Sequence, residues 1–100
     1  MKYLSTRDDS LSRSFNDILY QGLSRDGGLY LPKSWPKIDL LSLKNKSYEE
    51  VACEIIFPYV NENIEKLELQ KILHETYSKF DHNKIAPLVE LENNKFLLEL

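Results

Sequence analysis

The sequence predicts an α+β fold with three main helices, short strands and a C-terminal β-hairpin. Apolar residues recur at intervals of three and four in three segments, which is the spacing of a buried helix face. The pattern of a capping box precedes two of these segments. After Asp81 the helical spacing gives way to two extended apolar runs separated by Asn93-Asn94, and this pattern is typical of a hairpin.

The first helix is expected to begin at Ser14, because Ser14 to Asp17 has the Ser-x-x-acid form of a capping box. A short strand is expected before it, over residues 2–6, followed by a polar loop over residues 7–13. We expect Gly22 to lie on the buried face of this helix and to allow a close backbone contact there. The residues of that face are Phe15, Ile18, Leu19, Gly22 and Leu23.

The stretch from Arg25 to Pro32 is expected to end the first helix and to start a strand. Arg25 would lie at the helix C-terminus, where positive charge is favoured, and Gly27 or Gly28 would take the left-handed cap conformation. Pro32 disfavours helix at the residue before it, so residues 29–31 should be extended. Phosphate-binding glycine loops lie between a strand and a helix N-terminus, which is the opposite order, so we prefer the cap.

The middle of the chain is expected to hold a loop, a single helical turn and two longer helices. Residues 33–37 form the loop, which carries Trp35, and residues 39–43 form the turn. The second helix should be capped by Ser47 and Glu50 and should end or kink at Pro58, which removes one helical hydrogen bond. The third helix should start between residues 63 and 67. Its apolar face is Leu69, Ile72, Leu73, Thr76, Tyr77 and Phe80.

Two extended runs close the chain, over residues 88–92 and 95–100, and Asn93-Asn94 would form the turn between them. A domain usually finishes on a polar tail, whereas this chain ends inside an apolar run. We therefore expect the natural protein to continue beyond Leu100.

Composition and charge exclude several classes of protein. The hydrophobic fraction of 42% is that of a globular chain, and the net charge of −3 favours neither nucleic acid nor an anionic membrane. Cys53 is the single cysteine, so no internal disulfide can form, and the chain has neither a signal peptide pattern nor a run long enough to span a membrane. These features predict a soluble cytoplasmic protein.

Few residues of the sequence are candidates for catalysis or ligand binding. His74 and His82 match no zinc spacing, and His74 is expected on the solvent face of the third helix. Cys53 has apolar neighbours and is expected to be a core side chain rather than a nucleophile. The hydroxyls and guanidinium of residues 5–7 could bind an anion, although hydrogen bonding at a strand end is the favoured interpretation. No catalytic, cofactor-binding or metal-binding residue is predicted.

The order of several short motifs resembles the start of the threonine synthase family. The motifs are Tyr3-x-Ser5-Thr6-Arg7, the run from Asp26 to Pro32, Trp35-Pro36, Ala86-Pro87-Leu88 and Leu97-Leu98-Glu99-Leu100. The family commonly has glycines after Ser-Thr-Arg, whereas this sequence has Asp8-Asp9. The signature residues, for which we expect an architectural role, are Ser5, Thr6, Arg7, Asp26, Gly27, Gly28, Leu29, Tyr30 and Pro32.

The resemblance implies a pyridoxal-phosphate (PLP) enzyme of the tryptophan-synthase-β type. Such an enzyme converts O-phospho-L-homoserine and water to L-threonine and phosphate. In the family the cofactor lysine follows a Leu-Glu-Leu motif, which here is residues 98–100. The resemblance therefore divides this chain into an N-terminal domain, residues 1–85, and a hairpin, residues 86–100, that leads into the catalytic domain. That catalytic domain would be its partner, and residues 1–100 alone should be inactive and bind no PLP.

Two other interpretations are open. The chain could be a stand-alone interaction module that docks a partner through Trp35 and the strand at residues 29–31. It could also belong to a threonine-synthase-like phospho-lyase that acts on a related phosphorylated amino acid.

Overall fold

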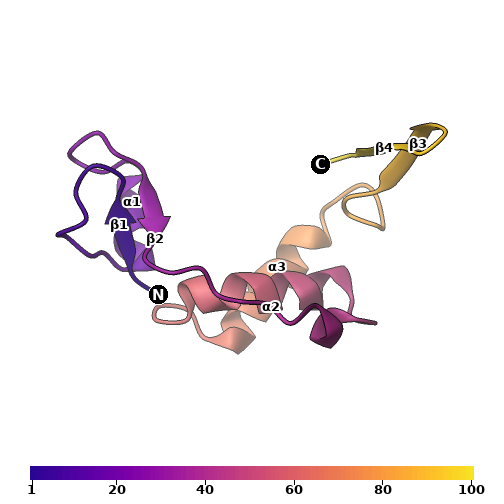
Figure 1. Cartoon of the computed structure of the whole chain (residues 1–100). Helices are drawn as coiled ribbons and strands as arrows, with labels where there is room; N and C mark the ends of the chain where they lie inside the picture. Colours follow the sequence, from indigo (N-terminus) through magenta and orange to yellow (C-terminus); the bar gives the residue numbers. More distant parts are fainter.

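The computed structural model describes residues 1–100 as three parts that follow one another along the chain (Figure 1). A small strand pair with one short helix lies at one end, two longer helices lie in the middle, and a hairpin projects at the other end, over a length of 48 Å. This arrangement confirms the α+β prediction. The elements are β1 (Tyr3–Ser5), α1 (Phe15–Gln21), β2 (Tyr30–Pro32), α2 (Tyr48–Val60), α3 (Lys66–Tyr77), β3 (Leu88–Glu92) and β4 (Lys95–Leu98).

Strands β1 and β2 pair antiparallel, with Tyr3 opposite Pro32 and Ser5 opposite Tyr30. The backbone of Tyr3 also exchanges two hydrogen bonds with Arg13, both 2.9 Å long, so that the polar loop between them returns to the strand. The buried Tyr3 ring directs its hydroxyl to the backbone oxygen of Tyr59, 2.8 Å away. The two strands predicted for this half are therefore confirmed, and Tyr3 ties them to α2.

Helix α1 is shorter than predicted. The capping box is present, since Ser14 Oγ accepts the Asp17 N–H (3.2 Å) and Asp17 Oδ2 accepts the Ser14 N–H (3.0 Å). The helix stops at Gln21, because Gly22 turns the chain with a φ of 70° that other residues avoid. The predicted helix end at Arg25 is therefore wrong. Gly27 does have a positive φ, 80°, as predicted for one of the two glycines, but it lies in the turn before β2 and not at a helix cap.

The predicted buried face of α1 is also wrong, because no other element of the chain covers it. No residue of α1 is buried, and Leu19 and Leu23 lie open to solvent. Gly22 makes no close contact, since a Cβ there would meet no atom within 4 Å. Only Phe15 reaches the core and contacts Tyr3, with ring centroids 6.4 Å apart.

Helices α2 and α3 pack against each other and form the core. Ser47 and Glu50 make the predicted capping box, and α3 begins at Lys66, inside the predicted interval. Helix α2 ends at Val60, two residues after Pro58, so the proline lies in its last turn. Before α2, residues Leu40–Leu43 form the predicted single helical turn, of the 3₁₀ type. The buried apolar side chains of this core are Cys53, Val60, Leu69 and Leu73.

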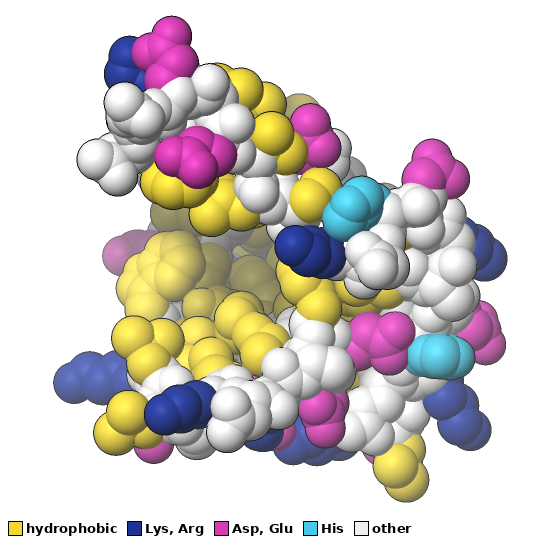
Figure 2. Space-filling model, turned by 90° about the vertical axis from the view of Figure 1, so that its right-hand side faces the viewer, with side chains coloured by type: hydrophobic (Ala, Val, Ile, Leu, Met, Phe, Trp, Pro, Cys, Tyr) yellow, Lys and Arg dark blue, Asp and Glu magenta, His cyan; other side chains and the backbone are white.

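The hairpin of β3 and β4 confirms the prediction for the end of the chain. Asn94 has a φ of 61°, the left-handed conformation that the turn needs, and Val89 lies opposite Leu97. None of the hairpin residues is buried. Figure 2 shows that apolar side chains on the underside of the hairpin face an apolar hollow above the rest of the molecule.

No helix of the chain has both the length and the apolar character that a membrane span requires.

Candidate functional site

The signature residues at the end of β1 and before β2 form a hydrogen-bonded cluster, which we call the clamp (residues 5–7 and 26–29). The Asp26 carboxylate is its centre, because Oδ1 accepts both the Ser5 hydroxyl (2.9 Å) and the Gly28 N–H (2.8 Å). Ser5 Oγ accepts in turn the Arg7 N–H at 3.2 Å. The Arg7 guanidinium donates to the backbone oxygen of Asp26 at 3.0 Å.

A second set of bonds extends the β1–β2 pairing by one residue. The Thr6 N–H donates to the Leu29 oxygen (2.8 Å), and the Leu29 N–H donates to Thr6 Oγ1 (3.0 Å). The turn between α1 and β2 closes on itself through Ser24, whose oxygen accepts the Gly27 N–H and whose N–H reaches the Gly28 oxygen. The polar groups of the clamp therefore satisfy one another.

The two glycines are required for different reasons. Gly27 has a φ of 80°, which other residues rarely adopt, and a Cβ there would lie 2.8 Å from Arg7 Nη1. Gly28 has no such φ, but a Cβ there would overlap Ser5 Oγ and lie 3.0 Å from both Asp26 Oδ1 and Thr6 Oγ1. Residue 28 is thus glycine because the clamp closes directly over it.

Hydrogen bonds lower the pKa of the two carboxylates of this region. The Gly28 N–H, and after it the Ser5 hydroxyl, lowers the pKa of Asp26. Hydrogen bonds from Ser10 lower the pKa of Asp8, and the nearby charge of Asp26 opposes this shift weakly. Both groups carry negative charge at neutral pH, as aspartates ordinarily do, and the lowered pKa extends this charge to more acidic pH.

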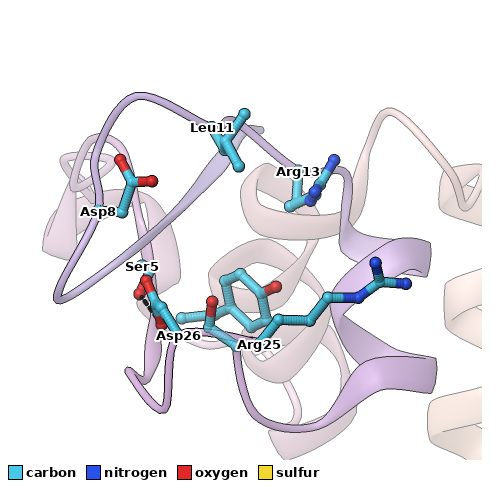
Figure 3. A pocket seen from close by; sticks show the side chains of 8 residues that line it. Ser5, Asp8, Leu11, Arg13, Arg25 and Asp26 are labelled. Carbon is cyan, nitrogen blue, oxygen red and sulfur yellow. Dashed lines mark hydrogen bonds between the residues drawn. The ribbon is translucent and has the colours of Figure 1, made fainter.

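A cavity of about 220 Å³ opens beside the clamp (Figure 3). In the figure, Asp8 and Asp26 lie on one side of it, Arg13 and Arg25 on the other, and Leu11 lies above. Arg13 and Arg25 also line a second cavity of about 460 Å³ on α1. The full lining of the first cavity is Ser5, Asp8, Leu11, Arg13, Ser24, Arg25, Asp26 and Tyr30.

The structure brings seven of the nine signature residues into the clamp and places the other two in β2. Tyr30 donates its hydroxyl to Gln21 Oε1 at 2.5 Å, and Pro32 pairs with Tyr3. Arg13 was not predicted to line a site, and Arg25 was predicted to lie at a helix end. No sequence pattern could have identified either arginine as a lining residue, because the two are twelve residues apart and reach the same cavity only through the turn of the chain at Gly22.

The other candidates lie in ordinary environments. Cys53 is 2% exposed, as predicted for a core side chain, and burial raises the pKa of its thiol. His74 lies on the surface, as predicted, with Nδ1 3.2 Å from a Glu49 oxygen. No three His, Cys, Asp or Glu side chains are placed to hold a metal ion.

Comparison with known proteins identifies relatives along the whole chain. The family model described as the threonine synthase N terminus matches residues 2–77. The threonine synthase of Pseudomonas aeruginosa is 39% identical over 103 residues, which cover 100% of this chain and 22% of that protein. The threonine synthase of Schizosaccharomyces pombe is 36% identical over 100% of this chain and 20% of its own length.

Solved structures of threonine synthases also match this chain. A crystal structure of a PLP-bound threonine synthase from Brucella melitensis has a TM-score of 0.91 and 39% identity, covering 99% of this chain and 22% of that one. The Escherichia coli threonine synthase, at 20% identity and a TM-score of 0.85, shows the shared fold alone. The chain thus spans about a fifth of the length of the relatives it matches. With a family model that covers most of its residues, this chain belongs to the threonine synthase family and corresponds to its N-terminal portion.

Proposed function

We propose that this chain is the N-terminal domain of a PLP-dependent threonine synthase, which converts O-phospho-L-homoserine and water to L-threonine and phosphate in the cytoplasm. The observation that carries the proposal is the family match over residues 2–77, together with 39% identity to a threonine synthase along the whole chain. The clamp supports it, because the signature residues of the family resemblance are the ones that bond to one another.

In this proposal the PLP site lies outside this chain. The Gly27-Gly28 turn is the one glycine-rich segment, and a phosphate cradle there would need free backbone N–H groups. Both are engaged, since the Gly27 N–H bonds to the Ser24 oxygen and the Gly28 N–H bonds to Asp26. No lysine lines the cavity beside the clamp. The residues present therefore do not fit the cofactor, and we assign no catalytic residue to this chain.

The role we propose for the chain is to dock on the catalytic domain of the same protein. The hairpin carries apolar side chains on both faces, and such a hairpin is stable when both faces are covered. The apolar hollow beneath it continues this surface (Figure 2). Since the relatives are about five times longer than this chain, the rest of the protein is the natural occupant.

An assay of the complete gene product tests the proposal. It should release phosphate from O-phospho-L-homoserine with formation of threonine, and it should show the visible absorbance of PLP bound to a lysine that lies after Leu100. Leu97→Asp, which places a charge on the apolar hairpin, should lower the activity strongly. Lys95→Asp, at the hairpin turn, is the matched control and should keep it.

The two alternatives predict other outcomes. A gene product that stops at Leu100 and binds a partner protein without PLP would establish an interaction module, for which the 70% exposed Trp35 would be the anchor. A complete protein that releases phosphate from a different phosphorylated amino acid would establish the related phospho-lyase. The observation that favours this second alternative is the 30% identity to the threonine synthase-like 2 protein of Xenopus laevis.

A further inference from the structure

The cavity beside the clamp separates positive from negative charge. Arg13 and Arg25 line one side, and neither takes part in a salt bridge. Asp8 and Asp26 line the other side and are close enough for each charge to affect the other (Figure 3). An isolated anion entering the cavity would meet two carboxylates, and an isolated cation would meet two guanidinium groups.

A ligand that carries both charges, a short distance apart, satisfies both sides. We infer that this cavity binds a small zwitterionic α-amino acid, with its carboxylate on Arg13 and Arg25 and its ammonium group on Asp8 and Asp26. Guanidinium groups match a carboxylate because their donors form a planar fork, and each aspartate offers oxygens to an ammonium group.

The remaining lining fits a small side chain that carries a hydroxyl. The cavity of about 220 Å³ is below the range typical of sites for drug-sized ligands, which favours a ligand of few atoms. Leu11 and the Tyr30 ring supply apolar contact, and Ser24 supplies a hydroxyl. The clamp holds the Asp26 carboxylate in place, and backbone bonds to Tyr3 fix the backbone of Arg13 beside the cavity.

The choice of ligand to test rests on the proposed function, since L-threonine, the product of that reaction, has this charge pattern and a small hydroxyl side chain. The site lies on the N-terminal domain, between the end of β1 and the turn that precedes β2. Binding here would let the product act on the clamp and on the loop of residues 7–13.

Hydrogen–deuterium exchange of the complete protein, read by peptide mass spectrometry, tests the inference without using activity. L-threonine should slow exchange, saturably, in the peptides over residues 5–13 and 24–30. Arg25→Met and Asp8→Asn should each raise the half-saturating concentration about tenfold or more, because each removes one charged partner. Lys37→Met, which removes a cation outside the cavity, is the matched control and should leave it unchanged.

Altered ligands test whether both charges of the amino acid are needed for binding. L-threonine amide lacks the carboxylate, N-acetyl-L-threonine lacks the ammonium group, and inorganic phosphate is an anion alone. Each should protect these peptides at least about tenfold more weakly than L-threonine. Exchange in the peptide over α2 reports whether a variant is folded. If a variant is unfolded, Arg25→Lys takes its place, because lysine keeps the positive charge but lacks the planar guanidinium donors.

Absence of local protection by L-threonine, or protection that Arg25 and Asp8 variants leave unchanged, would overturn the inference. Equal protection by phosphate would also overturn it, in favour of an anion site. Failure of the proposed function would appear instead as missing phosphate release, which this experiment does not measure.

Discussion

Gly28→Ala offers the sharpest test of the clamp, because steric overlap is the reason that residue 28 is glycine. The new Cβ would overlap Ser5 Oγ and lie 3.0 Å from Asp26 Oδ1 and Thr6 Oγ1, inside ordinary van der Waals contact. None of these atoms can move aside freely, since Ser5 and Asp26 bond to each other and Thr6 bonds to residue 29. Relief therefore requires the clamp to open.

The expected cost has two parts. Forcing a methyl group into a well-packed position costs about 1–3 kcal/mol, and losing one hydrogen bond of the clamp costs about 1 kcal/mol more. We expect Gly28→Ala to lower the free energy of opening of the β1–β2 region by about 2–4 kcal/mol. Native-state amide exchange at the Thr6 and Leu29 N–H groups, both bonded across the clamp, measures this free energy directly.

Gly22→Ala is the matched control. Gly22 has a φ of 70° and a ψ of −83°, a backbone conformation that other residues rarely adopt, but no atom lies near a Cβ there. Alanine at this position therefore costs backbone strain alone, about 1–3 kcal/mol. Adding Ser5→Ala to Gly28→Ala removes the overlapping hydroxyl and should recover about 1 kcal/mol relative to the sum of the single changes. If Gly28→Ala costs less than about 1 kcal/mol, or if adding Ser5→Ala recovers nothing, the steric argument is wrong.

Three further outcomes are expected. Hydrogen bonds lower the pKa of Asp26 in the folded chain, so the ionised carboxylate stabilises the fold above the unfolded pKa of about 4, and this stabilisation is lost as pH falls through the folded pKa. Opening of the clamp, measured by amide exchange at Leu29, should therefore become easier in that acidic range, and Asp26→Asn should remove this pH dependence. Leu69→Ala should cost about 2–5 kcal/mol in urea denaturation, since Leu69 is 4% exposed, whereas Leu67→Ala, at a 72% exposed residue, should change stability by less than about 0.5 kcal/mol. Burial and a raised pKa should make Cys53 react with a disulfide reagent only at the rate of unfolding; immediate reaction in the native protein would contradict its placement.

The sequence by itself determined the elements whose signals are local. The capping boxes at Ser14 and Ser47, the start of α3 and the Asn93-Asn94 turn appear where the pattern predicts them, because a cap or a turn depends on side chains a few residues apart. The family motifs, too, are a matter of residue order, and they led to the family that the comparisons show.

Only the tertiary structure decided where α1 ends and what the signature residues do. The three–four spacing of Leu19 and Leu23 predicts a buried face, but burial depends on whether another element covers that face, and here none does. Likewise, Ser5 and Asp26 are distant in the sequence, and they meet because the antiparallel pairing of β1 and β2 folds one over the other. The same pairing and the turn at Gly22 bring Arg13 and Arg25 to one cavity, a juxtaposition that periodicity cannot reveal because it arises between segments rather than within one.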